Sequence, residues 1–207
     1  MTIFETAPSF CLALTGGIAC GKSTVGARLA HAGLHRVDSD QVARQVVLPG
    51  TPGLAGVVQL FGEGVLLPDG TMDRRAVGQR VFASERARRD LESLLHPLIW
   101  KVMSDEMAVA ADTRRETVFE IPLLYENGNE SRFSTVWVVA VSRGVQLQRL
   151  QDRDRLSFEE AQARLDSQMD VEEKARRADY VIRNEGAPEA LDAAIAQGLA
   201  RWREARA

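Results

Sequence analysis

The chain has 207 residues, 45% of them hydrophobic and 27% charged, a composition typical of a globular domain with one substantial core. Its net charge of −3 offers no electrostatic support for a nucleic-acid partner. No apolar run approaches the length of a membrane span, and residues 1–10 lack the basic region of a signal peptide. Two cysteines, Cys11 and Cys20, are too few for a disulfide framework, so we expect a reduced, cytoplasmic compartment. The lack of a long apolar run predicts no membrane partner.

The first predicted unit is a strand, a glycine-rich loop and a helix. Residues 9–15, SFCLALT, form a short and nearly continuous apolar run of the kind found in buried parallel strands. The loop GGIACGKST follows, and the helical pattern after it ends near Gly33. Residues 34–40 predict a second strand with acidic residues at its carboxyl end.

The rest of the chain predicts helices that alternate with further strands. Helical patterns dominate residues 41–115, which we interpret as an insertion between the second and third strands. Ser157 and Glu160 form a capping-box pattern where two charged helices meet. The alternation predicts a three-layer α/β fold with a five-stranded, mainly parallel sheet. The remaining strands are predicted at 116–122, 134–142 and 178–186, the charged helices at 145–169 and an amphipathic helix at 187–207.

The loop matches the phosphate-binding pattern G-x-x-x-x-G-K-[ST] in full, at Gly16, Gly21, Lys22 and Ser23. Glycines allow backbone N–H groups to converge on phosphate oxygens, and the following helix directs its positive end at the same place. The Lys22 ammonium adds a full charge at the γ-phosphate, and the Ser23 hydroxyl can ligate Mg²⁺. We therefore expect the phosphates of a nucleotide to bind at Gly17, Ala19, Cys20, Gly21, Lys22, Ser23 and Thr24, with Mg²⁺ as a cofactor at Ser23.

Cys20 lies inside this loop and allows two interpretations. The helix dipole can lower the pKa of its thiol and make the residue oxidisable. The alternative, which we favour, is a small filler whose amide contributes to phosphate binding.

Two other classes of nucleotide protein lack their patterns here. A regulatory GTPase needs D-x-x-G after a strand and an [NT]-K-x-D motif, but no Asp of the chain has Gly three residues later. The two lysines outside the loop, Lys101 and Lys174, follow Trp and Glu. A mechanical ATPase usually carries an acidic residue that closes an apolar strand, and the strands predicted at 116–122 and 134–142 do not end in one.

Asp38 and Asp40 end the second predicted strand. Ligands of open α/β sheets bind at the carboxyl ends of the strands, and strand alternation would place both carboxylates on one side. A carboxylate there can accept a hydrogen bond from an acceptor hydroxyl and aim it at the γ-phosphorus. We favour this interpretation, which points to a small-molecule kinase, over the simpler role of Asp40 as a helix cap.

Arg149 and Arg153 lie four residues apart and therefore on one face of the helix predicted after the fourth strand. A lid arginine at this place can neutralise the charge on a transferring phosphoryl group as the site closes. The alternative is a solvated surface helix in an arginine-rich chain.

His96 and Pro97 follow the apolar sequence LESLL. Pro97 fits the start of a helix better than its interior, because proline has no N–H to donate. A lone histidine is more often a cap or a core residue than a catalyst, so the residues alone leave the role of His96 open.

Taken in order, the motifs resemble those of the dephospho-coenzyme A kinase family. The resemblance implies a phosphotransferase with an alcohol acceptor, which uses ATP to phosphorylate the ribose 3′-hydroxyl of dephospho-coenzyme A in the last step of coenzyme A synthesis. It also implies a P-loop NTPase fold with a nucleotide-binding core (9–40, 116–146 and 177–207), a helical acceptor-binding insertion (41–115) and a helical lid (147–176). The matching segments, within residues 12–186, are LTGGIACGKST, VDSDQVARQVVLPGTPG, FGEGVLLPDGTMDRR, LESLLHPLI, IPLLYE, QLQRLQDRD, EEAQARLDSQM and ADYVIRNEG.

The resemblance also assigns roles to individual residues. Asp40 becomes the catalytic carboxylate, with Asp38 beside it at the acceptor site. Arg149 becomes the catalytic lid arginine, supported by Arg153, and Lys22 acts on the phosphates. The resemblance assigns Asn184 to a contact with adenine. It assigns four further residues to the acceptor: His96, Pro122, Leu123 and Leu124.

The loop departs from the family's usual GIGSGKS at Ala19 and Cys20. If position 19 required a positive φ, alanine would strain the loop by about 1 kcal/mol or more. We expect an ordinary helical or extended φ there. The paired acids stand as Asp38-Ser39-Asp40, where many members have Asp-Ala-Asp, which is a mild change.

Two alternatives stand beside this function. A shikimate-type kinase also carries paired acids after its second strand, but it typically has a glycine-rich turn where this chain has Pro122-Leu123-Leu124. A nucleotide-binding switch would need the motifs that the chain lacks. We expect ATP and dephospho-coenzyme A as partners, with no nucleic acid, and a monomer or weak homo-oligomer.

Overall fold

The computed structural model describes residues 7–206, and the chain divides into two compact units. The first unit holds the described residues up to Val37 together with those from Met107 onward, and the second unit is Asp38–Glu106. The phosphate-loop pattern therefore lies in the first unit, while Asp40 and His96 lie in the second.

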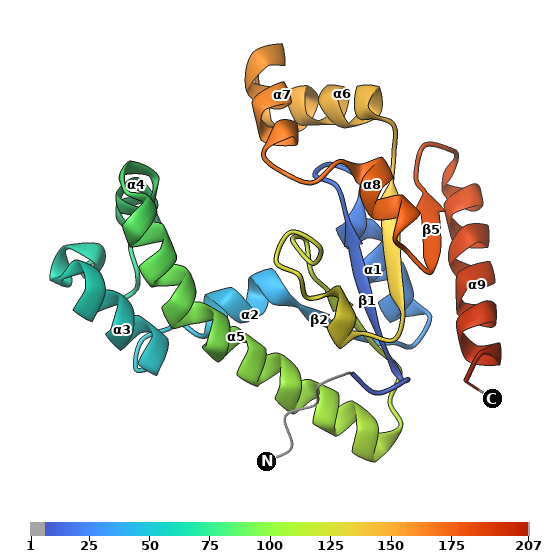
Figure 1. Cartoon of the computed structure of the whole chain (residues 1–207), viewed down its shortest axis with the longest axis horizontal. Coiled ribbons are helices and arrows are strands. Elements are labelled where there is room, and N and C mark those ends of the chain that lie inside the picture. Colours follow the sequence, from blue (N-terminus) through green and yellow to red (C-terminus); the bar gives the residue numbers. More distant parts are fainter. Residues whose placement is uncertain (1–6, 207) are drawn as a thin grey trace. The chain divides into compact units, whose positions relative to one another are not determined.

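A five-stranded sheet organises the first unit, with strand order β2-β3-β1-β4-β5. Its strands β1, β2 and β5 are labelled in Figure 1. Strand β1 pairs in parallel with both β3 and β4, and β4 pairs in parallel with β5. Every residue of β1, β3 and β4 is buried, as expected for strands that are covered on both faces. The predicted α/β fold is confirmed. The strands are β1 (Cys11–Gly16), β2 (His35–Asp38), β3 (Thr117–Glu120), β4 (Val136–Ala140) and β5 (Tyr180–Arg183).

The helices of the first unit pack on this sheet and on each other. Helix α1 contacts β1 and β3, α8 contacts β4, and α9 lies alongside β5 (Figure 1). Helices α6 and α7 pack together around Leu150, Ala161 and Leu165. The capping box predicted at Ser157 and Glu160 begins α7 and is confirmed. The elements are α1 (Lys22–His31), η2 (Glu130–Arg132), α6 (Arg143–Asp154), α7 (Phe158–Asp166), α8 (Val171–Arg176) and α9 (Pro188–Glu204).

The second unit is helical, as predicted for this stretch. Helix α3 begins at a proline, and the Thr51 hydroxyl accepts the Leu54 N–H at 3.3 Å to cap it. Gly56 packs closely on α5, because a Cβ at this position would lie 2.6 Å from a methyl group of Leu94. The elements are α2 (Ser39–Gln45), α3 (Pro52–Phe61), η1 (Glu63–Val65), α4 (Arg74–Ala83) and α5 (Glu85–Thr113), whose last turns from Met107 belong to the first unit.

Strand β2 ends at Asp38, two residues earlier than predicted. The Asp38 carboxylate accepts the Asp40 N–H at 2.9 Å and caps α2, which begins at Ser39. An aspartate that binds a nearby backbone N–H in this way competes with continuation of the strand. The prediction that Asp38 and Asp40 share one side of an extended segment is therefore wrong, and so is the alternative that Asp40 is the cap.

Pro97 lies inside α5, and the prediction that it starts a helix is wrong. Proline removes the N–H that would bind the carbonyl four residues earlier, which here belongs to Ser93. Ser93 and Pro97 are both exposed, so water can bind the freed carbonyl and the helix can continue.

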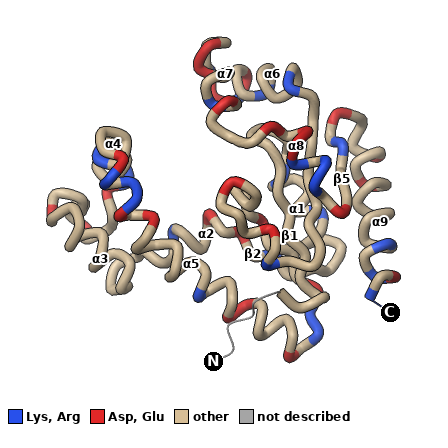
Figure 2. The backbone as a smooth tube through the Cα atoms, in the orientation of Figure 1, with Lys and Arg blue, Asp and Glu red and all other residues tan. Residues whose placement is uncertain are grey.

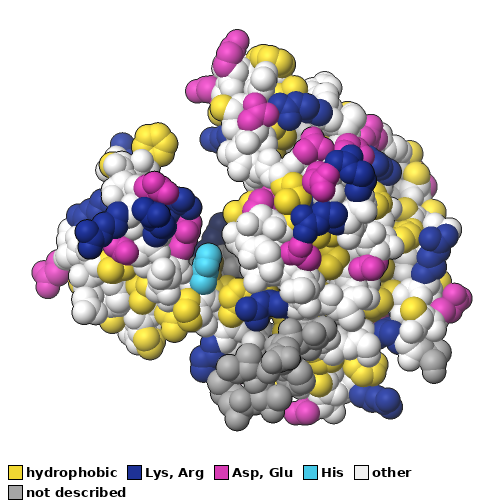
Figure 3. All heavy atoms as spheres, in the orientation of Figure 1, with side chains coloured by type: hydrophobic (Ala, Val, Ile, Leu, Met, Phe, Trp, Pro, Cys, Tyr) yellow, Lys and Arg dark blue, Asp and Glu magenta, His cyan; other side chains and the backbone are white. Residues whose placement is uncertain are grey.

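Charges of both signs share the surface of the first unit. Acidic and basic residues follow one another along α6, α7 and α8 (Figure 2). On the face drawn in Figure 3, basic and acidic side chains gather together where α8 lies. Arg143 pairs with Asp166, and Arg183 pairs with Glu172. Within residues 7–206, no helix combines the length and the apolar character needed to cross a membrane.

Candidate active site

The phosphate loop runs from Gly16, at the end of β1, to the first turn of α1. Gly21 has a φ of 85° and stands at the N-cap of α1, in a left-handed conformation that favours glycine. Lys22 and Ser23 open the helix, whose positive end therefore faces the loop. The side chains of Ser23 and Thr24 are exposed in this turn. The strand, loop and helix context predicted for the motif is confirmed.

Three successive carbonyl groups of the loop are bound by side chains from later in the chain. The N–H that follows a carbonyl in a trans peptide points the opposite way. The bonds therefore hold the N–H groups of Ala19 and Gly21 on the other side of the loop, where an anion can reach them. The three bonds run from Gln146 Nε2 to Ile18 O (2.7 Å), from Arg149 Nη1 to Ala19 O (3.2 Å) and from Asn184 Nδ2 to Cys20 O (2.9 Å).

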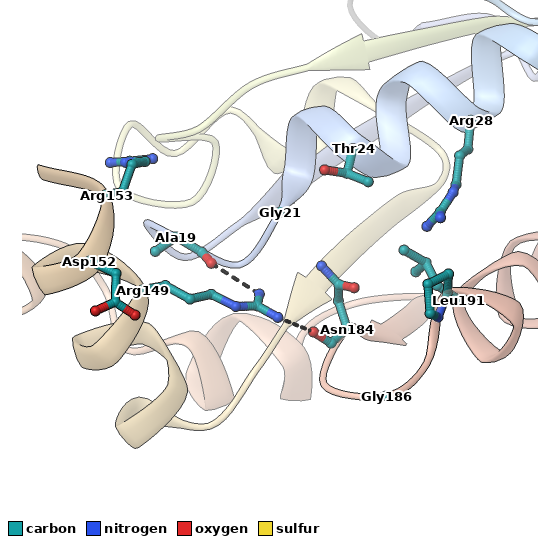
Figure 4. Close-up of a pocket in the computed structure, with 11 residues that line it drawn as sticks. Ala19, Gly21, Thr24, Arg28, Arg149, Asp152, Arg153, Asn184, Gly186 and Leu191 are labelled. Atoms are coloured by element: carbon teal, nitrogen blue, oxygen red, sulfur yellow. Dashed lines mark hydrogen bonds between the residues drawn. The ribbon is translucent and has the colours of Figure 1, made fainter.

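A cavity of about 650 Å³ lies beside the loop (Figure 4). Its volume falls within the range of roughly 300–1,000 Å³ that is usual for small-molecule sites. Arg149 reaches from α6 between the loop and the turn after β5, and its second Nη donates to Asn184 O at 2.8 Å (Figure 4). Arg149 and Arg153, which their spacing places on one face of α6, both border this cavity. Other lining residues are Ala19, Thr24, Arg28, Asn184 and Leu191.

Arg153 is more loosely held than Arg149. Its guanidinium binds Asp154 at 2.8 and 3.0 Å, and its side chain is 60% exposed. The hydrogen bond from Arg153 lowers the pKa of the Asp154 carboxyl. Arg164 of α7 binds the same carboxylate at 2.9 Å, so this cluster ties α6 to α7.

Sequence reasoning missed the acid nearest to Lys22. Strand β3 ends at Glu120, whose fully buried carboxylate binds Lys22 Nζ through Oε2 at 3.0 Å. The other oxygen is bound by Arg36 of β2. The expectation that the third strand does not end in an acid is wrong, because the strand stops two residues before Pro122. The available signal was a single acid within the apolar run VFEIP, since a buried charge needs a partner.

Gly26 makes room for this carboxylate on α1. A Cβ at Gly26 would lie 1.6 Å from Glu120 Oε1, far inside contact distance. The absence of a side chain at this one position lets α1 approach the end of β3 closely. Glu120 can therefore reach Lys22 one turn earlier on the same helix.

Ala19 has a φ of 62°, so the prediction of an ordinary φ is wrong. A non-glycine residue in the left-handed region costs about 1 kcal/mol or more. Two contacts hold the residue there: its carbonyl accepts the bond from Arg149, and its side chain packs on the core between α6 and α7.

Cys20 is fully buried, and its N–H donates to Gly17 O at 3.2 Å. Burial raises the pKa of the Cys20 thiol, which is opposite to the effect considered for the helix dipole. The interpretation of Cys20 as a small filler agrees with this environment, and its amide already serves the loop itself.

The residues assigned to the acceptor have different surroundings. Leu124 is fully buried, whereas Pro122 is half-buried and Leu123 is exposed. His96 is exposed on α5. Asp40 is exposed on α2, and its carboxylate makes no hydrogen bond or ion pair within residues 7–206. Contact of any of these residues with an acceptor stays a prediction.

Comparison with known proteins decides the family. The sequence model described as dephospho-CoA kinase matches residues 10–189. The chain belongs to the dephospho-CoA kinase family. A dephospho-CoA kinase of Anaeromyxobacter dehalogenans is 50% identical over 181 residues, which cover 87% of this chain and 86% of that protein. A dephospho-CoA kinase of Geobacter sulfurreducens is 45% identical over 188 residues, which cover 89% of this chain and 94% of that protein.

Solved structures agree with this membership. The structure of TT1252 from Thermus thermophilus has a TM-score of 0.77 at 33% identity, covering 92% of this chain and 96% of that one. A dephospho-CoA kinase from Campylobacter jejuni has a TM-score of 0.75 at 28% identity, covering 96% and 99%. This dephospho-CoA kinase family member is thus an ATP-using phosphotransferase of coenzyme A synthesis, and the shikimate-type alternative is less supported.

We expect Ala19→Gly to be as stable as the parent chain or more stable. Glycine removes left-handed strain of about 1 kcal/mol, while the freedom it adds to the unfolded chain offsets part of the gain. Ala30→Gly is the control, because Ala30 is an exposed residue of α1 where glycine costs about 1 kcal/mol. Urea unfolding measures both variants. Equal losses of stability would contradict the strain at Ala19.

We expect Gly26→Ala to destabilise the protein by about 1–3 kcal/mol, because the new Cβ displaces the Glu120 carboxylate. Gly78→Ala is the matched control, since a Cβ at Gly78 of α4 meets nothing within 4 Å. That change should stabilise the protein by about 0.5–1 kcal/mol. Urea unfolding compares the two, and a neutral or stabilising Gly26→Ala would refute the close fit of α1 on Glu120.

Proposed function

We propose that the cavity beside the loop binds ATP and that the γ-phosphoryl group passes to the ribose 3′-hydroxyl of dephospho-coenzyme A. The observation that carries this proposal is the phosphate loop, whose carbonyls are bound from outside, next to a cavity large enough for a nucleoside. The phosphates lie against the N-terminus of α1, and the base lies toward Asn184 and Thr24 in the cavity.

Lys22 and Arg149 supply the positive charge that acts on the phosphates. The Lys22 side chain is 13% exposed, so an anion can reach its ammonium, which moves from Glu120 toward the γ-phosphate. Arg149 uses one N–H of each terminal nitrogen to bind the loop and the turn. A guanidinium has five N–H donors, so the others can bind phosphate oxygens in the transition state. Arg153, at the cavity edge, adds charge when the lid closes.

Mg²⁺ fits this donor set. The Ser23 hydroxyl is exposed in the first turn of α1, directly after Lys22. Within residues 7–206 no group of three or more His, Cys, Asp or Glu is placed to hold a metal ion. Mg²⁺ keeps several waters and binds phosphate oxygens readily, and the Ser hydroxyl of the phosphate-loop motif would be its protein ligand. When bound, the ion would neutralise charge on the β- and γ-phosphates.

Asp40 acts on the acceptor in this proposal. Its exposed carboxylate follows β2 directly, at the carboxyl end of a strand, where ligands of open α/β sheets bind. The carboxylate accepts the proton of the 3′-hydroxyl while the oxygen forms a bond to the γ-phosphorus and the bond to the β-phosphate oxygen breaks. ADP leaves with the electron pair of that bond, and Asp40 passes its proton to solvent.

The other residues complete the acceptor side. Asp38 fixes the backbone of Asp40 through the cap of α2. Pro122 and Leu123 contact the acceptor in this proposal, and the buried Leu124 supports their segment. The exposed His96 of the second unit is proposed separately as an acceptor contact. We also propose a cytoplasmic location, which the two free, buried cysteines support, and a monomer or weak homo-oligomer.

Substrate choice tests the function. We expect ADP release, measured in a coupled assay, when ATP is offered with dephospho-coenzyme A and not when it is offered with shikimate. Turnover with shikimate alone would overturn the proposal, because the acceptor would then be a different alcohol.

Asp40→Asn tests the base. We expect kcat to fall by about 10²-fold or more while the Kd for ATP is retained, because an amide cannot take the proton. Asp105→Asn, at an exposed ion pair on α5, is the control and should keep the parent kcat. If Asp40→Asn stayed within a few-fold of the parent, Asp40 would have no catalytic role.

A further inference from the structure

Lys174 of α8 is fully buried, although the chain strongly favours arginine. Of 26 basic residues, only Lys22, Lys101 and Lys174 are lysines. Lys22 belongs to the phosphate loop, and Lys101 is 56% exposed on α5. Lys174 is 0% exposed. A buried ammonium is costly unless it is paired and hydrogen-bonded, so its partners decide what it does.

The ammonium of Lys174 has three N–H donors and three acceptors. It binds the carbonyl oxygens of Gly16 at 3.3 Å and Pro122 at 3.2 Å, and it pairs with Glu126 Oε1 at 2.7 Å. Every donor of a lysine is thereby used. A guanidinium is planar, larger and carries five donors, so arginine cannot replace lysine at this point.

The three acceptors of Lys174 come from segments with different tasks. Gly16 ends β1 and begins the phosphate loop, while Pro122 begins the segment proposed to meet the acceptor. Glu126 lies in that same segment and also accepts the N–H of Met169, in the connection between α7 and α8. One buried charge thus joins the donor loop, the acceptor segment and the end of the lid.

Neighbouring contacts strengthen this junction. The Thr15 hydroxyl donates to the same Pro122 carbonyl at 3.1 Å, so that oxygen is bound twice. Val171, at the start of α8, packs closely on Gly17. A Cβ added to Gly17 would lie 3.2 Å from the Cβ of Val171. The first residues of the loop therefore rest on α8 and on the segment after β3.

We propose that Lys174 is a positioning residue, which sets the spacing between the phosphate loop and the acceptor segment at Pro122. This role rests on the proposed function, because the 3′-hydroxyl must lie in line with the γ-phosphorus within a fraction of an ångström. The outer carbonyls of the loop are held independently by Gln146, Arg149 and Asn184. Loss of Lys174 therefore misaligns transfer without removing the ATP site.

Lys174→Met tests the proposal, because methionine fills a similar length without donors. We measure thermal unfolding, the stoichiometry and Kd of ATP by calorimetry, and kcat with dephospho-coenzyme A. We expect kcat per ATP-binding site to fall on the order of tenfold or more, with a Kd for ATP within about twofold of the parent. Lys101→Met is the matched control and should retain both values.

A purely structural role gives a different result. If Lys174→Met lowers activity only in proportion to the sites that bind ATP, kcat per site is unchanged and the proposal is overturned. Should that variant not fold, Glu126→Gln carries the test, because glutamine keeps the shape and the acceptor but removes the charge. For Glu126→Gln we expect kcat per ATP-binding site to fall by less than in Lys174→Met, while the Kd for ATP stays near that of the parent. An unchanged kcat per site would overturn the proposal.

The parent chain separates this inference from the function on which it rests. No transfer to dephospho-coenzyme A by the parent would refute the proposed function. Transfer by the parent with an unchanged kcat per site in the variants would refute only the role of Lys174.

Discussion

A peptide backbone carries as many carbonyl oxygens as N–H groups, and a phosphate site must turn the carbonyl oxygens away. In this chain the loop does so with help from outside, since side chains from α6 and from the turn after β5 bind three carbonyls in a row. Arg149 binds the loop and the turn together, which makes one residue both a support of the donor site and a candidate for catalysis. Helix α6 therefore contributes to the shape of the phosphate loop.

The position of the Lys22 ammonium is also fixed by a side chain from another segment. The buried Glu120 carboxylate holds the ammonium with one oxygen and Arg36 with the other. Because Arg36 holds the other oxygen, the movement of Lys22 to a phosphate in the proposed function would leave the buried carboxylate with a charged partner. Gly26 is the local condition for this arrangement, since any side chain there would occupy the place of the carboxylate.

Local signals predicted much of the fold and the donor motif. The strand, loop and helix around the loop follow from glycine spacing, apolar runs and capping residues, all within about 25 residues. The φ of Ala19 was not predicted, because it depends on a tertiary bond from Arg149 and on packing against α6 and α7. The cap formed by Asp38 was not predicted, because residues 38–40 fit both a strand with alternating side chains and a helix cap.

Contacts between segments far apart in the chain could not be predicted from the sequence. Glu120 contacts Lys22 because β3 lies beside β1 in the sheet. No local sequence pattern predicts this strand order. Lys174 binds Gly16 across 158 residues of chain. The scarcity of lysine was visible in the composition, but only burial shows that the third lysine is a junction and not a surface charge.

The boundary between the two units falls at Asp38, and this placement separates two tasks. The side chains that bind the loop carbonyls belong to the first unit, so the phosphate loop and the groups that support it lie within one unit. Asp40 begins the second unit, and its backbone is fixed by the Asp38 carboxylate in a single capped turn. In the proposed function Asp40 is the base, so its alignment with the acceptor hydroxyl would depend on that cap. Disturbing the cap should therefore weaken phosphoryl transfer, whereas ATP binding depends on groups that lie elsewhere in the chain.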